Sequence, residues 1–360
     1  MDIFKHLQML TETPGPSGYE HSVAAAIEEA WRPYVDSFTR DRVGNLIALK
    51  QGQGKEPRPR LLLAAHMDEI ALMVSQIEAH NGYGFLRLTN VGGVDIRHLY
   101  GQLVIVHGRR DLPGVLGSLP AAMLPEDKRD KAFGFEALVA DVGLPLDEVK
   151  AQVSIGDFIS FRQPLRRLLS NRVAGKALDN RASVAAVTVC LENLRGRDHE
   201  WDVVAVATAQ EETRLLGAFT SAYAQQPAAA VAIDVTFGKG PGASDERTFE
   251  LGGGPVLEVG PNVHPGMYQA LKDAATALEM KFDTGTHSRA SGTDAFGLQI
   301  AREGVPTGLV SIPLRYMHTM VESLDTADVE RCGRLLGEFI ARLDDQFLDK
   351  LAVGLMEIRN

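Results

Sequence analysis

Apolar runs that stop at an acidic residue or a histidine are the feature that most restricts how this sequence can fold. Uninterrupted apolar runs of about four to eight residues are typical of strands buried on both faces of a parallel sheet. Four runs of this kind are followed by such polar residues: Leu61–Ala65 before His66, Val203–Thr208 before Glu211 and Glu212, Ala229–Ile233 before Asp234, and Gly308–Ile312 before His318.

Longer amphipathic stretches alternate with these runs and predict helices. The predicted helices are Phe4–Leu10, Tyr19–Trp31, Asn180–Asn193, Gly266–Glu279, Gly292–Glu303 and Ala327–Leu343. A strand followed by a helix, repeated along the chain, predicts an α/β fold with a doubly wound sheet flanked by helices.

The middle of the chain, residues 68–163, has a different pattern. Its apolar segments are short, lack helical periodicity and are separated by Gly, Pro and Asp: Phe85–Leu88, Leu103–His107, Val115–Leu119 and Asp157–Phe161. This pattern predicts a small β-rich domain inserted into the α/β domain. Residues 1–67 and 164–360 would then be the two parts of the α/β domain. The charged segment Leu124–Phe135 is predicted to be a solvated loop.

Composition narrows the class of protein. The chain has 360 residues, 45% of them hydrophobic, which is enough for a large core. The formal net charge of −10 argues against a nucleic-acid surface, and no run of apolar residues is long enough to cross a membrane. Two isolated cysteines, Cys190 and Cys332, and a start unlike a signal peptide favour a cytoplasmic protein.

The polar residues after the strands predict a ligand site, because ligands bind at the carboxyl ends of strands in such sheets. Asp179, before a predicted helix, is a further candidate. Each residue has a structural explanation when taken alone: His66 as a hydrogen-bonded core histidine, Asp179 as a helix cap, Asp234 as a turn residue. Together, however, so many buried carboxylates would repel one another unless cations neutralise them.

Divalent metal ions are the simplest such cations. Mixed histidine and carboxylate ligands suit zinc, cobalt or manganese better than calcium or magnesium. The number of ligands fits two ions about 3.5–4 Å apart. In His66-Met67-Asp68, the two-residue step points both polar side chains the same way, so Asp68 could accept the second ring N–H of His66. Of the adjacent Glu211 and Glu212, one could bind metal while the other takes a proton from water.

The sequence resembles the tetrahedral (TET-type) and deblocking aminopeptidases, a family of dinuclear, glutamyl aminopeptidase-like metallopeptidases. The resemblance covers nearly the whole chain. Its motifs are Thr13-Pro14-Gly15-Pro16-Ser17-Gly18-Tyr19-Glu20, Val43-Gly44-Asn45-Leu46, His66-Met67-Asp68-Glu69-Ile70, Lys176-Ala177-Leu178-Asp179-Asn180-Arg181, Gln210-Glu211-Glu212, Ile233-Asp234, Ser291-Gly292-Thr293-Asp294-Ala295 and Met317-His318.

The resemblance implies a zinc-peptidase-like fold, with a mixed sheet, and a role for each candidate residue. The implied metal ligands are His66, Asp179, Glu212, Asp234 and His318, with Asp179 bridging the two ions. Glu211 would be the general acid/base, and Asp68 would orient His66. The loop Gly292-Thr293-Asp294 would line the substrate cleft, although Thr293 could equally be a helix cap.

The resemblance also implies cofactors and partners. The cofactors would be two divalent ions per subunit, with zinc expected first and cobalt or manganese as alternatives. The substrates would be peptides with a free N-terminus, and the inserted domain would help dimers assemble into a hollow dodecamer. The sequence departs from the family pattern at Arg214 and Leu216, where the family has Gly and Arg, and at Pro120-Ala121-Ala122, where it has Pro-Pro-His.

Two other functions are compatible with the same motifs. A metal-dependent deacylase or carboxypeptidase-like amidohydrolase would keep the metals but need a basic residue for the substrate carboxylate; Arg214, Arg289 and Arg315 are candidates. A non-catalytic scaffold would be expected to lack at least one ligand, and all five are present. The side chain preferred at the first residue of the substrate is not determined by these motifs.

Overall fold

The computed structural model describes residues 1–129 and 134–351. Its largest element is a mixed eight-stranded sheet in which β12, β3, β13 and β16 run parallel at the centre. On either side, β2 and β14 join this parallel centre by antiparallel pairing; the edge strand β1 is antiparallel to β2, and the edge strand β15 is parallel to β14. The strand order is β1 (Ser37–Arg40), β2 (Leu46–Lys50), β12 (Asp202–Thr208), β3 (Arg60–His66), β13 (Ala229–Phe237), β16 (Thr307–Leu314), β14 (Val256–Val259) and β15 (Asp283–Thr286).

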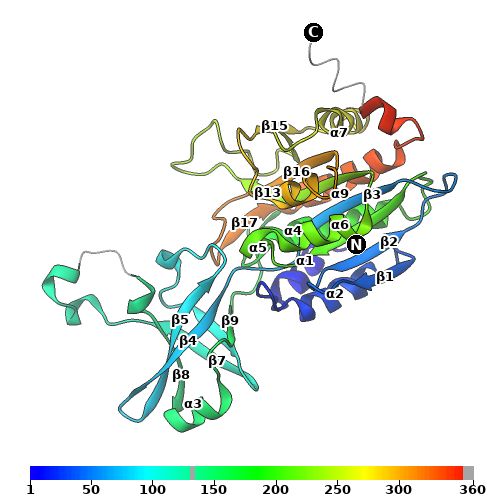
Figure 1. The fold of residues 1–360 in the computed structure, drawn as a ribbon. Coiled ribbons are helices and arrows are strands. Elements are labelled where there is room, and N and C mark those ends of the chain that lie inside the picture. Colours follow the sequence, from blue (N-terminus) through cyan, green and yellow to red (C-terminus); the bar gives the residue numbers. More distant parts are fainter. Residues whose placement is uncertain (130–133, 352–360) are drawn as a thin grey trace.

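Helices cover both faces of this sheet (Figure 1), so the predicted α/β class is confirmed. One face carries α1 (Ile3–Glu12), α2 (His21–Trp31), α4 (Leu178–Asn193), α7 (Pro265–Ala277) and α9 (Thr326–Ala341), and the other carries α6 (Leu216–Gln225) and α8 (Asp294–Gln299). The core strands are apolar on both sides because both sides are covered; every residue of β12 and β16 is buried.

A closed barrel of six strands projects from the edge of this α/β part (Figure 1). In barrel order its strands are β4 (Ala71–His80), β5 (Tyr83–Val91), β8 (Val139–Pro145), β7 (Asp111–Gly117), β6 (Leu103–His107) and β9 (Phe158–Phe161), with α3 (Leu146–Gln152) against it. All six strands lie inside the segment predicted to be β-rich. The barrel has a hydrophobic core of its own, including Leu72, Leu86 and Val104.

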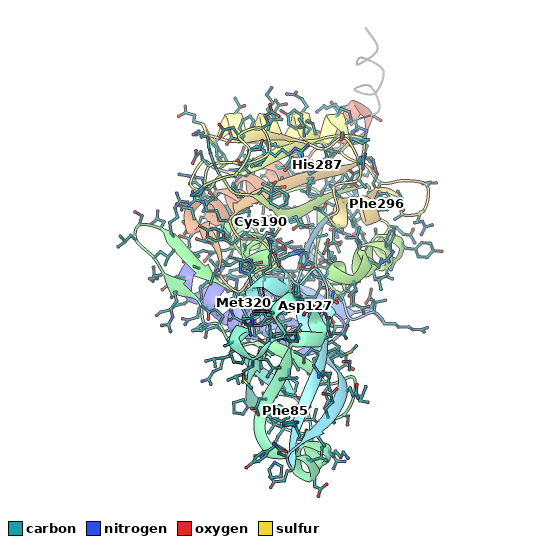
Figure 2. All side chains as sticks on the ribbon, turned by 90° about the vertical axis from the view of Figure 1, so that its left-hand side faces the viewer. Phe85, Asp127, Cys190, His287, Phe296 and Met320 are labelled. Atoms are coloured by element: carbon teal, nitrogen blue, oxygen red, sulfur yellow. The ribbon has the colours of Figure 1, made fainter. Side chains whose placement is uncertain are left out.

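The barrel core also contains one residue from far along the chain. Met320 is 2% exposed and packs among the barrel residues, although it follows β16 of the main sheet. Figure 2 shows Met320 where the two parts meet, with Phe85 in the barrel and Cys190 and His287 in the α/β part. The loop between β16 and β17 (Glu322–Asp325) is therefore anchored on the barrel. Strand β17 belongs to a small sheet with β11 (Arg172–Gly175) and β10 (Arg166–Arg167).

The predicted helices agree with the structure except at Gly292–Glu303, where α8 is much shorter. Gly292 has φ +73°, and Thr293 is extended and accepts a hydrogen bond from the backbone N–H of Ala295, so the helix begins only at Asp294. Helices α3 and α6 were not predicted. The described residues of the predicted loop at 124–135 include the 3₁₀ turn Glu126–Lys128 and the first residue of another, Phe135–Ala137; residues 130–133 lie outside the described residues.

Across 1–129 and 134–351, no helix is both long and apolar enough to span a bilayer.

Candidate metal centre and substrate pocket

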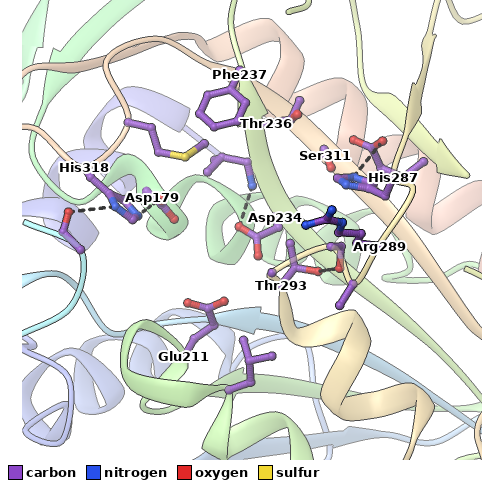
Figure 3. Close-up of a pocket in the computed structure, with 18 of the residues that line it drawn as sticks. Asp179, Glu211, Asp234, Thr236, Phe237, His287, Arg289, Thr293, Ser311 and His318 are labelled. Carbon is purple, nitrogen blue, oxygen red and sulfur yellow. Dashed lines mark hydrogen bonds and ion pairs between the residues drawn. The ribbon is translucent and has the colours of Figure 1, made fainter. Parts of the chain in front are cut away.

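The polar residues predicted from the ends of the strands converge on one pocket at the carboxyl edge of the sheet (Figure 3). His66 ends β3, Asp234 lies in β13, and the short helix α5 (Glu211–Arg214) follows β12. Asp179 lies at the start of α4 and His318 in the loop after β16. All of them, together with Glu211 and Glu212, line a cavity of about 1310 Å³. This volume exceeds that of a typical small-molecule pocket and leaves room for several residues of a peptide.

Asp179 lies between two imidazoles. Its Oδ1 is 3.2 Å from Nε2 of His66, and its Oδ2 is 3.5 Å from Nε2 of His318. Nε2 of His66 also lies 3.9 Å from Oδ1 of Asp234, while Nε2 of His318 lies 3.7 Å from Oε1 of Glu212. One carboxylate thus faces two separate groups of possible ligands.

Two overlapping sets of side chains have the spacing needed to hold a divalent ion. Among the described residues, donor atoms of His66, Glu211 and Asp234 lie within 4.8 Å of one another, and so do those of His66, Asp179 and Glu212. Imidazole nitrogens and carboxylate oxygens are the donors that zinc and its neighbours in the transition series prefer.

The electrostatics of the pocket also fit a metal centre. Burial raises the pKa of Glu211 and of Asp234 above the ordinary carboxyl range, and neighbouring carboxylates raise both further. Burial opposes a proton on His66, but Glu211 and Asp179 outweigh it and raise the pKa of the imidazole. The carboxylates are therefore crowded together with too little positive charge from the chain itself. Divalent cations would supply that charge.

Asp68 holds the two glutamates as well as facing His66. Its Oδ1 accepts a hydrogen bond from the backbone N–H of Glu211 at 3.0 Å, and its Oδ2 accepts one from that of Glu212 at 3.1 Å. The Nδ1 atom of His66 lies 3.5 Å from Asp68 Oδ1 and 3.3 Å from its carbonyl oxygen. Sequence reasoning identified the pairing with His66 but missed the contact with the α5 backbone.

Glu322 is a second residue that sequence reasoning missed. Its carboxylate accepts hydrogen bonds from the backbone N–H groups of Asp179, at 3.0 Å, and His318, at 2.9 Å. Glu322 is 1% exposed, so it fixes the backbone of two pocket residues from behind the pocket. Its only signal in the sequence is an acidic residue beside the buried strand segment Ser323-Leu324, which is too common to single out.

The loop predicted to contact substrate divides between two environments. Gly292 and Thr293 line the pocket, and Thr293 also caps α8, whereas their contact with substrate stays a prediction. Asp294 is 2% exposed and is not among the lining residues; its Oδ2 accepts a hydrogen bond from Thr208. Asp294 therefore lies beneath the pocket.

This fold is the fold of the TET aminopeptidases. A TET aminopeptidase from the archaeon Thaumarchaeota archaeon SCGC AB-539-E09 superimposes with a TM-score of 0.89 at 29% identity, covering 97% of this chain and 98% of that one. The TET1 peptidase of Pyrococcus horikoshii, described as assembling into a tetrahedron or a large octahedral shell, matches with a TM-score of 0.82 at 30% identity, covering 95% and 100%. A lysyl aminopeptidase of Pyrococcus furiosus is 34% identical over 342 residues, 94% of this chain and 96% of that protein.

The chain belongs to the M42 glutamyl aminopeptidase family, whose model matches residues 44–335. It is a metal-dependent aminopeptidase, a hydrolase of peptides. The resemblance inferred from its motifs is thereby confirmed. Family membership implies divalent metal ions, and the donor set of the pocket is the place in the described chain where such ions fit.

The hydrogen bonds of Glu322 generate a prediction about metal binding. In Glu322→Gln only one side-chain oxygen remains to accept the two backbone N–H groups, so Asp179 and His318 should be held less firmly. We expect zinc affinity to fall roughly 10- to 100-fold, the usual effect of losing a residue that orients metal ligands. Affinity is measured by competition with a chelator. Glu330→Gln, an exposed change on α9, is the control. Equal zinc affinity in both variants would contradict the role given to Glu322.

Proposed function

We propose that this protein removes single residues from the free N-termini of peptides with the help of two divalent ions. Five side chains would hold the ions, with Asp179 between them: His66, Asp179, Glu212, Asp234 and His318. The contact of Asp179 with both imidazoles is the observation that carries this proposal, because one carboxylate placed between two ligand groups suits a bridging ligand. Zinc is the first expectation, with cobalt or manganese as alternatives.

Bound ions of this kind polarise the scissile carbonyl and lower the pKa of water to about 7. The chain's own residues would manage the protons. Glu211, whose Oε2 lies 3.8 Å from Nε2 of His66, would take a proton from the attacking water and pass it to the leaving amine. Asp68 would keep His66 and the backbone of α5 in place during this exchange.

The restriction to the first residue would come from the free α-amino group of the substrate. A cationic amine is attracted to the buried carboxylates of the pocket, whereas an acylated nitrogen carries no charge. Gly292 and Thr293 would contact the substrate from the opposite loop, and Asp294 would support them from below.

The alternative within the same fold is a deacylase or carboxypeptidase-like amidohydrolase. It would require a cation for the substrate carboxylate. Arg214 and Arg289 line the pocket and are exposed, but Arg315 is not among the lining residues. Family membership favours the aminopeptidase. A non-catalytic scaffold is disfavoured because every proposed ligand faces the pocket.

We also propose a division of the chain into two domains and an assembly of its subunits. Residues 1–67 and 164–360 would form the catalytic domain and residues 68–163 an inserted domain that contributes to assembly. Dimers would associate into a hollow dodecamer in the cytoplasm, admitting peptides and excluding folded proteins. Large apolar side chains exposed on the barrel and its loops support an interface there: Tyr83, Leu103, Leu119, Met123 and Ile155.

A panel of p-nitroanilides tests the aminopeptidase directly. The panel contains Leu, Lys, Glu and N-acetyl-Leu derivatives, each with zinc, cobalt, manganese or EDTA. We expect release of p-nitroaniline from the free-amine substrates with a metal, none with EDTA, and none from N-acetyl-Leu. Cleavage of the acetylated substrate would favour the deacylase instead. No cleavage under any metal would favour the scaffold.

The role of Glu211 has its own test. Glu211→Gln removes the proton acceptor but keeps the size of the side chain, so kcat should fall by roughly 10²- to 10⁴-fold. Metal content, measured by atomic emission, should stay at the wild-type value because the five proposed ligands are intact. A near-normal kcat would refute the assignment, and a loss of metal would mean that Glu211 is itself a ligand.

The assembly is tested by light scattering on the purified protein. A dodecamer predicts the mass of twelve chains of 39.0 kDa each. If the particle instead has the mass of two chains, the protein is a dimer and the proposed chamber does not form.

A further inference from the structure

A buried carboxylate at the far side of the pocket is not used by the proposed mechanism. Glu258, on β14, lines the same cavity as the metal-binding residues and is 1% exposed. Neither of its oxygens has a hydrogen-bond partner among the described residues. Its one ion-pair contact there is with His287, whose Nε2 lies 3.2 Å from Oε2. Figure 3 shows His287 and His318 on opposite sides of Asp234.

The neighbouring strand is shaped to admit this carboxylate. Glu258 pairs with Gly285 of β15, and a Cβ atom at position 285 would lie 1.9 Å from Oε2 of Glu258. Any other residue at 285 would force the carboxylate to move. The absence of a side chain at Gly285 thus leaves the room that the Glu258 carboxylate occupies in this pocket.

Glu258 is also incompletely neutralised. A buried carboxylate that accepts no hydrogen bond is unfavourable unless a cation compensates it. The nearby carboxylate of Glu258 raises the pKa of His287, but this half-buried imidazole is a single partner at one of the two oxygens. A cation arriving from the cavity would complete the site.

The sheet register places Glu258 at a useful distance from the metal-binding residues. Asp234 pairs with Ser311 of β16, Ser311 pairs with Val256 of β14, and Glu258 follows two residues later on the same face. The separation between Asp234 and Glu258 is two strand spacings across the sheet, roughly 10 Å, and two residues along it, roughly 7 Å. An extended lysine side chain spans roughly 6 Å from Cα to Nζ. A substrate residue held at its amino end near Asp234 could therefore reach Glu258 only with a long side chain.

The cations of the pocket lie in a different environment. Glu258 is buried, whereas the arginines that line the cavity are exposed: Arg214, Arg247 and Arg289. Charges in a buried site interact more strongly than charges screened by water. The buried anion should therefore dominate the selection of a side chain that enters the deep end of the cavity.

We propose that Glu258 binds the ammonium or guanidinium group of the first residue of the substrate, so that the enzyme prefers peptides beginning with lysine or arginine. The inference rests on the proposed function, which places the amino end of the substrate at the acidic cluster. It goes beyond that function because similarity does not determine the charge of the preferred first residue. The family is named for a glutamyl aminopeptidase, whereas one similar protein is a lysyl aminopeptidase.

The test compares lysyl with norleucyl p-nitroanilide, because norleucine has the four side-chain carbons of lysine without the ammonium group. In the wild type, kcat/KM should be higher for lysine. In Glu258→Gln the ratio of the two kcat/KM values should fall roughly 10- to 100-fold, the contribution of a hydrogen bond to a charged group. The ratio cancels any effect of the substitution on the hydrolysis step itself.

Two further variants separate a direct contact from general electrostatics. Glu246→Gln removes one negative charge from an exposed position that lines the same cavity and should leave the ratio within about twofold of the wild type, since its charge is screened by water. His287→Gln removes the imidazole that competes for Glu258 and should keep the ratio or raise it. Equal losses in Glu246→Gln and Glu258→Gln would overturn the proposed contact.

The wild type alone already provides a decisive outcome. A preference for norleucyl over lysyl p-nitroanilide, or for the glutamyl derivative over both, would overturn the role of Glu258 and favour Arg289 or Arg247 as the selecting residue. In either case the enzyme would still cleave free-amine substrates, and the proposed function would stand. Failure to cleave any of them would instead refute the proposed function.

Discussion

The crowding of buried carboxylates at one edge of the sheet is the constraint on which the rest of the structure depends. The chain compensates part of this charge with cations placed behind the pocket. Nζ of Lys176 lies 2.6 Å from Oε2 of Glu69, and the guanidinium of Arg181, fully buried, lies 3.7 Å from Oε1 of the same residue. The segment between these two cations contains Asp179. One short motif therefore supplies both a proposed metal ligand and two of the positive charges that allow acidic residues to be buried nearby.

Much of this arrangement could be predicted because it depends on local patterns. A strand buried on both faces must be apolar throughout, so the polar residue that ends it is conspicuous. That rule located His66, Glu211 and Asp234, and the structure brings them together. The parallel sheet then brings these residues together, because the carboxyl ends of its strands meet at one edge.

The contacts that could not be predicted are those that depend on tertiary structure. The carboxylate of Glu322 reaches the backbone of Asp179, which is 143 residues away in sequence, and no spacing reveals such a pair. Glu258 is similar: an acidic residue in a short strand is usually solvated, and its burial follows from the glycine opposite it. The start of α8 was misjudged for a local reason, since a positive φ at Gly292 delays the helix to Asp294.

The loop after β16 connects the barrel to the proposed metal centre. Met320 is buried in the barrel core, and Nδ1 of His318, two residues earlier, lies 3.1 Å from the carbonyl oxygen of Gly93. The barrel is therefore not a detachable module. A minimal enzyme made by excising the barrel would lose the support of an imidazole at the pocket, because the main sheet does not hold this histidine by itself.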